Sequence, residues 1–153
     1  MKEVIKFIAT GFGISKIAPH PGEGTVGTLV GIVIFVIWPD SRNFPVAYWL
    51  LLVIGMGVGI FVSGKAEEIF GEKDCPLIVI DEIIGYLFAM AFLPKKFWII
   101  VIAFIIFRII DGIKIKPIKA VEKLNGGIGV MLDDFIAGII TNIIMQLISW
   151  RFF

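Results

Sequence analysis

Residues 107–134 read FRIIDGIKIKPIKAVEKLNGGIGVMLDD and form an island of charged residues between two apolar runs. Asp111 lies at the end of the run before the island, and Asp133 and Asp134 lie at the start of the run after it. Charged side chains at the end of an apolar helix are costly unless they are paired, hydrated or bound to a ligand. The island therefore predicts a binding site at the mouth of a helical bundle.

The composition of the 153-residue chain favours one membrane domain over 1–153. Hydrophobic residues make up 58% of the chain, more than the roughly one-half of a typical soluble domain. The net charge of +1 argues against a nucleic-acid partner, which would require a strong basic excess. Cys75 is the single cysteine and His20 the single histidine, so the chain has no internal disulfide and no Cys/His zinc site.

Uncharged runs lie at 24–39, 43–64, 83–94, 97–107 and 135–150. They predict an all-α integral membrane helical bundle with about five short membrane-embedded helices, plus a short amphipathic helix at the N-terminus. Only 43–64 reaches by itself the length of about 20 residues that crosses a bilayer. The first helix, near 24–38, could be re-entrant, and a soluble bundle with a very apolar core is the alternative.

Five spans would divide the basic residues unequally between the two sides of the membrane. Ten fall on one side: Lys2, Lys6, Lys16, Lys65, Lys73, Arg108, Lys114, Lys116, Lys119 and Lys123. Four fall on the other: Arg42, Lys95, Lys96 and Arg151. Since cytoplasmic loops carry the excess of Lys and Arg, we expect the first side, which includes the island, to face the cytoplasm from the inner (cytoplasmic) membrane.

Residues 9–28, ATGFGISKIAPHPGEGTVGT, place glycines and hydroxyl groups before the first uncharged run. Such a loop can offer backbone N–H groups and a helix N-terminus to an anion. A Gly-Thr helix entry can also be a simple cap, and the pattern matches neither a Walker loop nor a dinucleotide fingerprint. From this segment alone, capping and anion binding both stay open.

Asp81 and Glu82 interrupt the apolar sequence at 78–85. Neighbouring residues of a helix point about 100° apart, so only one of the two acids would aim at a given centre. Gly85 would share a helix face with Asp81 and leave space beside its carboxylate. A helix cap explains one acid but not two acids this far inside an apolar segment.

The island itself allows simpler interpretations. Arg108 and Asp111 are three residues apart and can form an intrahelical ion pair. Its four lysines (Lys114, Lys116, Lys119 and Lys123) can contact anionic lipid headgroups. Asp133 and Asp134 are expected to begin the last helix, where one carboxylate would serve as a cap and a second exceeds that need.

Five carboxylates are thus expected to converge on one membrane face: Asp81, Glu82, Asp111, Asp133 and Asp134. Ligands that are all oxygen suit Mg²⁺, which often shares a substrate phosphate. Without a cation these acids would repel one another. The cluster therefore predicts either a divalent cation or a proton or cation pathway.

Other phosphatase chemistries fit the sequence poorly. A cysteine-nucleophile loop would need Arg six residues after Cys75, where the chain has Asp81, and His20 has no second histidine to act as an acid. Asp111-Gly112 also lacks the continuation of a phosphatidyltransferase motif. A metal-activated water remains, because a bound cation lowers the pKa of water and neutralises phosphate charge.

Taken together, five segments resemble the phosphatidylglycerophosphatase A family. They are ATGFG at 9–13, Pro21-Gly22 with TVGT at 25–28, VIDEIIG at 79–85, FRIIDGIK at 107–114 and GGIGVMLDDFIAG at 126–138. They occur in the family's order over nearly the whole chain. Two features depart from the family pattern: Glu23-Gly24 interrupt Pro-Gly-Thr, and Ile115 follows Lys114 where the family tends to have proline.

The resemblance implies Mg²⁺-dependent hydrolysis of phosphatidylglycerophosphate to phosphatidylglycerol and inorganic phosphate. It implies that the five acids are metal ligands and catalytic groups. It also implies that Arg108 and Lys114 bind the phosphate, with Thr25, Gly27 and Thr28 in the loop that donates hydroxyl or backbone N–H groups. A small cation or proton transporter that uses the same acids is the alternative, but it needs a polar path across the bilayer. The oligomeric state stays open.

Overall fold

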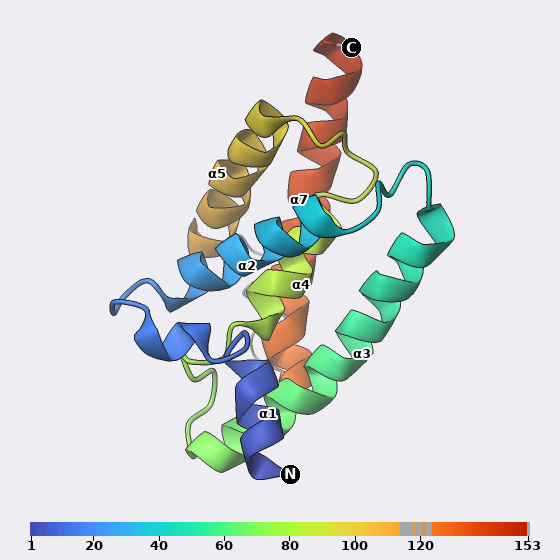
Figure 1. Cartoon of the computed structure of the whole chain (residues 1–153). Coiled ribbons are helices and arrows are strands. Elements are labelled where there is room, and N and C mark those ends of the chain that lie inside the picture. The colour runs from blue at the N-terminus through green and yellow to red at the C-terminus, as the bar shows by residue number, and fades with distance from the viewer. Residues whose placement is uncertain (114–117, 119–120, 122–123, 153) are drawn as a thin grey trace.

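The computed structural model describes residues 1–113, 118, 121 and 124–152, and within those residues it is helical with no strand (Figure 1). In chain order the elements are α1 (Lys2–Ala9), a short 3-10 helix η1 (Ile14–Ile17), α2 (Glu23–Ile37), α3 (Pro45–Phe70), α4 (Ile80–Ala89), α5 (Phe97–Ile113) and α7 (Gly127–Phe152). The expected all-helical class is confirmed.

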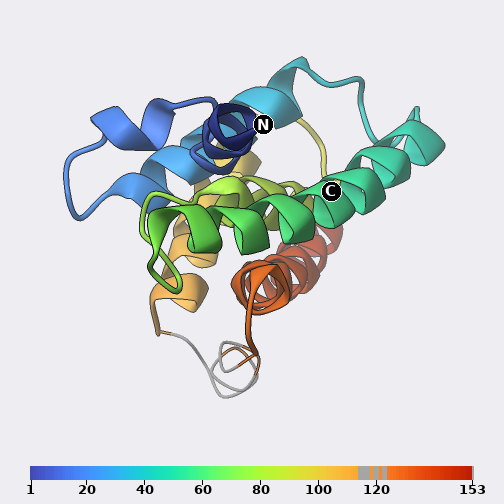
Figure 2. The same ribbon diagram turned by 90° about the horizontal axis from the view of Figure 1, so that it is seen from below.

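Helix α4 is the centre of the fold. Every residue of α4 except Glu82 is buried, because α2, α3, α5 and α7 all pack against this one short helix. Figures 1 and 2 show α4 enclosed by its neighbours, with α3 and α7 running past it. Apart from the two acids in its first turn, α4 carries almost only apolar side chains on all its faces, and such a helix belongs in an interior position. The two acids of α4 are therefore carried into the interior of the molecule.

The N-terminal helix α1 is amphipathic, as expected. Ile5 and Ala9 are buried, whereas Lys2 and Glu3 are exposed. The helix packs against α3. It therefore lies on the bundle through one face and leaves its charged face outward.

Two helices of the described residues are long and apolar enough to cross a membrane: α3 over Pro45–Phe70, and α7 over Gly127–Arg151. Only 28% of the apolar window of α3 is buried, whereas a core helix of a soluble protein would be mostly buried. Helices α2 and α5 have 15 and 17 residues. At about 1.5 Å per residue both are shorter than the roughly 30 Å hydrocarbon core. The expectation of five spans is therefore not established.

The expected third membrane segment differs most from the prediction. Instead of following the uncharged run at 83–94, helix α4 has ten residues, begins at Ile80 and ends at Ala89. Side chains bond the carbonyls at its end and just beyond it: Asn142 Nδ2 donates to the carbonyls of Ala89 and Ala91, each at 2.9 Å. Tyr48 Oη donates to the carbonyl of Leu87 at 2.7 Å. A helix can end inside an apolar environment only when its free backbone groups find such partners.

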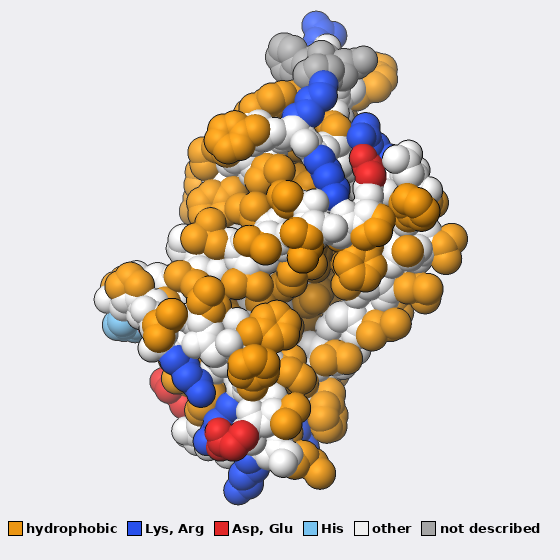
Figure 3. Space-filling model, viewed as in Figure 1, with side chains coloured by type: hydrophobic (Ala, Val, Ile, Leu, Met, Phe, Trp, Pro, Cys, Tyr) orange, Lys and Arg blue, Asp and Glu red, His pale blue; other side chains and the backbone are white. Residues whose placement is uncertain are grey.

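On the face seen in Figure 3, charged and apolar side chains occupy different zones. Figure 3 shows the Lys, Arg, Asp and Glu side chains gathered toward two ends, with hydrophobic side chains covering the face between them. Exposed large hydrophobic residues include Val53 and Phe61 of α3 and Leu147 of α7. An apolar band of this extent is typical of a surface that contacts lipid.

Candidate active site

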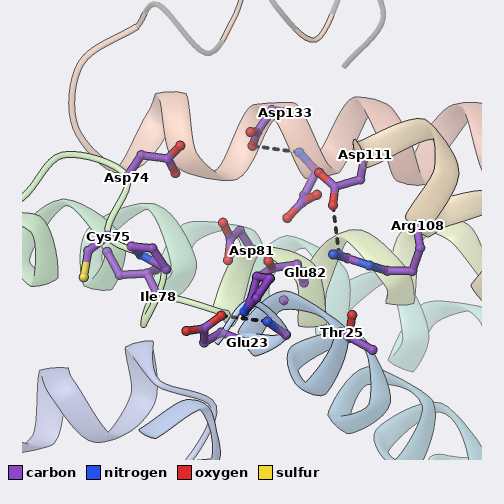
Figure 4. A pocket seen from close by; sticks show the side chains of 15 residues that line it. Glu23, Thr25, Asp74, Cys75, Ile78, Asp81, Glu82, Arg108, Asp111 and Asp133 are labelled. Carbon is purple, nitrogen blue, oxygen red and sulfur yellow. Dashed lines mark hydrogen bonds and ion pairs between the residues drawn. The ribbon is translucent and has the colours of Figure 1, made fainter. Parts of the chain in front are cut away.

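One cavity of about 410 Å³ lies where the first turns of α2 and α4 meet the end of α5 and the second turn of α7 (Figure 4). Among its lining residues are seven of the predicted site residues: Thr25, Asp81, Glu82, Arg108, Asp111, Asp133 and Asp134. They come from four helices and from positions far apart in the chain. The five acids that were expected on one membrane face all line this one cavity.

The start of α4 is fixed by the N-terminal segment. The backbone N–H of Val79 donates to the carbonyl of Ala9 at 2.9 Å. Ser15 Oγ donates to the carbonyl of Leu77 at 2.7 Å. These bonds hold the turn before α4, so that Asp81 and Glu82 enter the cavity from the first helical turn, where the helix dipole favours negative charge.

Asp133 and Asp134 do not begin the last helix, and that prediction was wrong. Helix α7 begins at Gly127, which places the two acids in its second turn. At this start α7 packs on α3, where a Cβ atom on Gly64 would lie 3.1 Å from the backbone nitrogen of Gly127. Helices α3 and α7 approach closely here. The acids therefore cannot be caps.

Small residues let α4 and α7 cross closely beside the acids. A Cβ atom on Gly85 would lie 2.7 Å from the carbonyl oxygen and 2.9 Å from the Cβ of Asp134. The space that Gly85 leaves is therefore filled by Asp134 of the neighbouring helix. Gly138 lies in turn against the backbone of Gly85. This crossing brings the acids of α4 and α7 together.

Three of the five acids form a compact cluster. One carboxylate oxygen from each of Asp81, Asp133 and Asp134 lies within 4.8 Å of the other two, and all three residues are buried. Asp81 Oδ1, Asp134 Oδ1 and Glu82 Oε2 are buried with no hydrogen-bond partner. Unpartnered buried carboxylate oxygens are costly unless a cation is bound. An all-oxygen donor set of this kind fits a hard divalent cation.

Arg108 and Asp111 form the intrahelical ion pair that their spacing allows. Arg108 Nη1 lies 2.8 Å from Asp111 Oδ2. Arg108 also lies against the first turn of α2, because a Cβ atom on Gly24 would be 3.2 Å from its Nη2. The pair leaves the guanidinium group on the wall of the cavity, where it can bind an anion.

The first turn of α2 supplies the other anion-binding groups. The amides of Gly24 and Thr25 belong to that turn, so they have no carbonyl partner within the helix. Both residues line the cavity. A helix N-terminus beside an arginine favours a phosphate or carboxylate.

Comparison with known proteins identifies the family. Residues 7–149 match the model of the family described as PgpA, phosphatidylglycerophosphatase A. The chain belongs to the phosphatidylglycerophosphatase A family. Family membership makes it an enzyme, a phosphatase.

Relatives of the phosphatidylglycerophosphatase A family cover almost all of the chain. A protein of Escherichia coli named phosphatidylglycerophosphatase A is 35% identical over 93% of this chain and 81% of its own length. A protein of that name from Haemophilus influenzae is 32% identical over 95% and 89%. A Bacteroides thetaiotaomicron protein, provisionally named phosphatidylinositol-3-phosphatase, is 32% identical over 94% and 92%. No solved structure matches.

Two predicted site residues of this phosphatidylglycerophosphatase A family member do not line the cavity, and a third is not among the described residues. Gly27 faces α4, where a Cβ atom would lie 2.8 Å from Val79 Cβ. Thr28 is fully buried, and its hydroxyl donates to the carbonyl of Gly24 at 2.9 Å. Lys114 lies outside the described residues.

The cavity also has lining residues that sequence reasoning did not select. Glu23 lines it, with Oε2 accepting the N–H of Gly22 at 2.9 Å and Oε1 lying 2.8 Å from His20 Nδ1. The sequence did contain a sign that Glu23 belongs to the site, because Glu23 interrupts the family's Pro-Gly-Thr pattern in the loop before α2. Cys75 also lines the cavity, and burial raises the pKa of its thiol. A protonated thiol is a poor nucleophile, in keeping with the exclusion of cysteine chemistry.

Proposed function

We propose that the chain is a single-domain, Mg²⁺-dependent membrane phosphatase that hydrolyses phosphatidylglycerophosphate to phosphatidylglycerol and inorganic phosphate. The observation that carries the proposal is the meeting of three buried acids, an arginine and a free helix N-terminus around one cavity. The names of the relatives from Escherichia coli and Haemophilus influenzae support this choice of lipid.

In the proposal, Asp81, Asp133 and Asp134 hold the cation, and Glu82 and Asp111 complete its surroundings. When bound, Mg²⁺ would lower the pKa of a water molecule and offset the charge of the phosphate. The three carboxylates lie on α4 and α7, so the Gly85–Gly138 crossing sets the spacing of the ligands.

Arg108 binds the phosphate oxygens in this proposal, assisted by the amides of Gly24 and Thr25. Asp111 orients the guanidinium group through the 2.8 Å ion pair. Lys114 is retained as a further phosphate contact, and the hydroxyl of Thr25 as another. Gly27 and Thr28 support the loop through packing and the bond to Gly24, rather than through direct contact.

Glu82 is the group that we assign to proton transfer. It lines the cavity, lies outside the three-carboxylate cluster and has a buried oxygen without a hydrogen-bond partner. The oxygen of the attacking water bonds to phosphorus, and the bond from phosphorus to the glycerol oxygen breaks. Glu82 accepts a proton from the water and then donates it to the glycerol oxygen as that oxygen departs, so Glu82 returns to its initial state.

The setting that we propose is the inner (cytoplasmic) membrane, in a multi-pass arrangement of about five embedded helices with the cavity facing the cytoplasm. The excess of Lys and Arg on the side of the cavity supports this orientation. The separation of charged ends from an apolar middle supports the embedding (Figure 3).

A cation or proton transporter is not favoured. A transporter would need charged or polar groups along a path through the bundle. Among the described residues, the buried charged side chains are Glu23, Asp81, Asp133 and Asp134, and all four line the same cavity. They support a site at one end rather than a path.

The proposal is tested with purified protein in detergent. We expect phosphate release from phosphatidylglycerophosphate in the presence of Mg²⁺, and loss of that release after chelation. Asp81→Asn and Asp133→Asn should each lower turnover by roughly 100-fold or more, because each removes a charged ligand from the cation. Phosphatidylinositol 3-phosphate, tested in parallel, measures the selectivity for the headgroup.

Asp40→Asn is the matched control, since Asp40 pairs with Arg42 in the loop between α2 and α3, outside the lining of the cavity. It should keep wild-type turnover. Full turnover in both Asp81→Asn and Asp133→Asn would show that the site is wrong.

A further inference from the structure

The rim of the candidate active site has two sides of different character. Figure 4 shows Thr25 and Arg108 on one side of the pocket and Asp74 and Cys75 on the other. Asp74 and Pro76 are exposed on a loop beyond any helix. Thr25 is also exposed, but it lies on α2, and the partly exposed Arg108 lies on α5. One side of the rim therefore leads to the loop, and the other leads along two apolar helices.

On α2, an exposed apolar stripe starts at the rim. Leu29 and Val33 follow Thr25 at successive intervals of four residues, which keeps them on about the same helix face. Their side chains are 48% and 58% exposed. Val36 continues the stripe away from the cavity.

On α5, a second exposed stripe starts at Arg108. Ile105 and Val101 precede it by three and seven residues, again on one helix face. Ile105 is 49% exposed, and Val101 is exposed as well. The two stripes begin at the same place, since Arg108 lies against Gly24, the residue next to Thr25.

A larger apolar groove elsewhere does not reach the cavity. It has a volume of about 570 Å³ and lies between α1, α2, α3 and α4. The contact between Gly27 of α2 and Val79 separates it from the cavity, because a Cβ atom on Gly27 would lie 2.8 Å from Val79 Cβ. The cavity and the groove share no lining residue, so the groove is not a continuation of the cavity.

We propose that the lipid substrate enters the active site sideways from the bilayer, over the rim formed by Thr25 and Arg108, and that its acyl chains lie against the two stripes. Leu29 and Val33 of α2, with Ile105 and Val101 of α5, form this acyl-chain surface. The proposal rests on the proposed function. It places the phosphate at Arg108 while the apolar part of the molecule stays in contact with apolar side chains.

The test compares long-chain phosphatidylglycerophosphate in mixed micelles with a short-chain, water-soluble form of the same lipid. For Leu29→Ser and Ile105→Ser, the ratio of kcat/KM on the long-chain form to kcat/KM on the short-chain form should fall about tenfold, mainly through KM, because apolar contact with the chains is lost. Leu29→Met and Ile105→Met keep that contact and should restore the wild-type ratio.

Val53→Ser and Ile143→Ser are matched controls, because these residues are 62% and 55% exposed on α3 and α7, away from the rim. They should keep the wild-type ratio. An unchanged ratio in the α2 and α5 variants, or an equal fall in the controls, overturns the acyl-chain surface alone. A wild-type protein inactive on both lipid forms overturns the proposed function, and this inference with it.

Discussion

Asp81 and Glu82 are neighbours in the chain but have different surroundings. Asp81 joins the cluster with Asp133 and Asp134, whereas Glu82 lies under Gly24 and close to Arg108. The turn of about 100° between adjacent helical residues separates them. In the proposed mechanism, Asp81 therefore lies on the cation side of the cavity and Glu82 on the phosphate side.

Gly24 gives a test at the scale of one residue. A Cβ atom at this position would contact Glu82 Oε1 and lie 3.2 Å from Arg108 Nη2. Gly24→Ala should displace both side chains and lower kcat about 10- to 100-fold, because small misplacements of catalytic groups have large effects on rate. The measurement is phosphate release under saturating lipid.

Gly57→Ala is the control for this substitution, since a Cβ atom on Gly57 would have nothing within 4 Å. The control should retain wild-type kcat and thermal stability. Equal activity in the two variants would contradict the close contact between α2 and the two side chains.

At the scale of elements, α4 is a short helix held at both ends. Its start is bonded to Ala9 and Ser15, and its end is bonded by Tyr48 and Asn142. These partners satisfy backbone groups at the two ends of α4, which a longer helix would satisfy within itself. They also fix the acids of its first turn relative to the rest of the bundle.

Asn142→Leu tests the end of α4. The substitution removes two donors and leaves carbonyls of Ala89 and Ala91 without this partner, so it should lower the free energy of unfolding by about 1–3 kcal/mol. Thermal unfolding in detergent measures the loss. Gln146→Leu removes a single bond to the Ala91 carbonyl and should cost less. A larger loss in Gln146→Leu would contradict the role of Asn142.

Helix existence was predictable from the uncharged runs, but helix ends were not. Helix α7 begins at Gly127, eight residues before the uncharged run at 135–150, because charge does not end a helix when tertiary contacts bury it. Helix α4 ends at Ala89 although the apolar run continues to 94, because distant side chains bond its carbonyls. Both boundaries depend on contacts far apart in the chain.

At the scale of the whole molecule, the convergence of the acids could be predicted because each lies at the edge of an apolar run. Which acids cluster could not, because the answer depends on how α4 and α7 cross at Gly85 and Gly138. The positions of Gly27 and Thr28 were similarly out of reach, since sequence alone does not distinguish a glycine that packs against a helix from one that approaches a ligand.

Cation binding should stabilise the whole bundle, because the cluster joins α4 to α7. Without a cation the three carboxylates repel one another across that contact. Saturating Mg²⁺, at about 100 times the dissociation constant, should add roughly 2.7 kcal/mol to the free energy of unfolding. A rise in Tm with Mg²⁺ concentration measures this effect.

Asp133→Asn should show a much smaller rise in Tm, whereas Asp40→Asn should behave like the wild type. An identical Mg²⁺ response in Asp133→Asn would show that the ion acts elsewhere on the protein.

The candidate active site is built from four helices, and this has a consequence for the synthesis of the chain. The ribosome completes α2, α4 and α5 well before α7, yet two of the three clustered acids lie on α7. A nascent chain that stops short of Asp133 holds Arg108 and the first turn of α2 but has only one of the three carboxylates. In the proposed mechanism, activity therefore requires the last helix, and a product that ends before Asp133 is expected to be inactive.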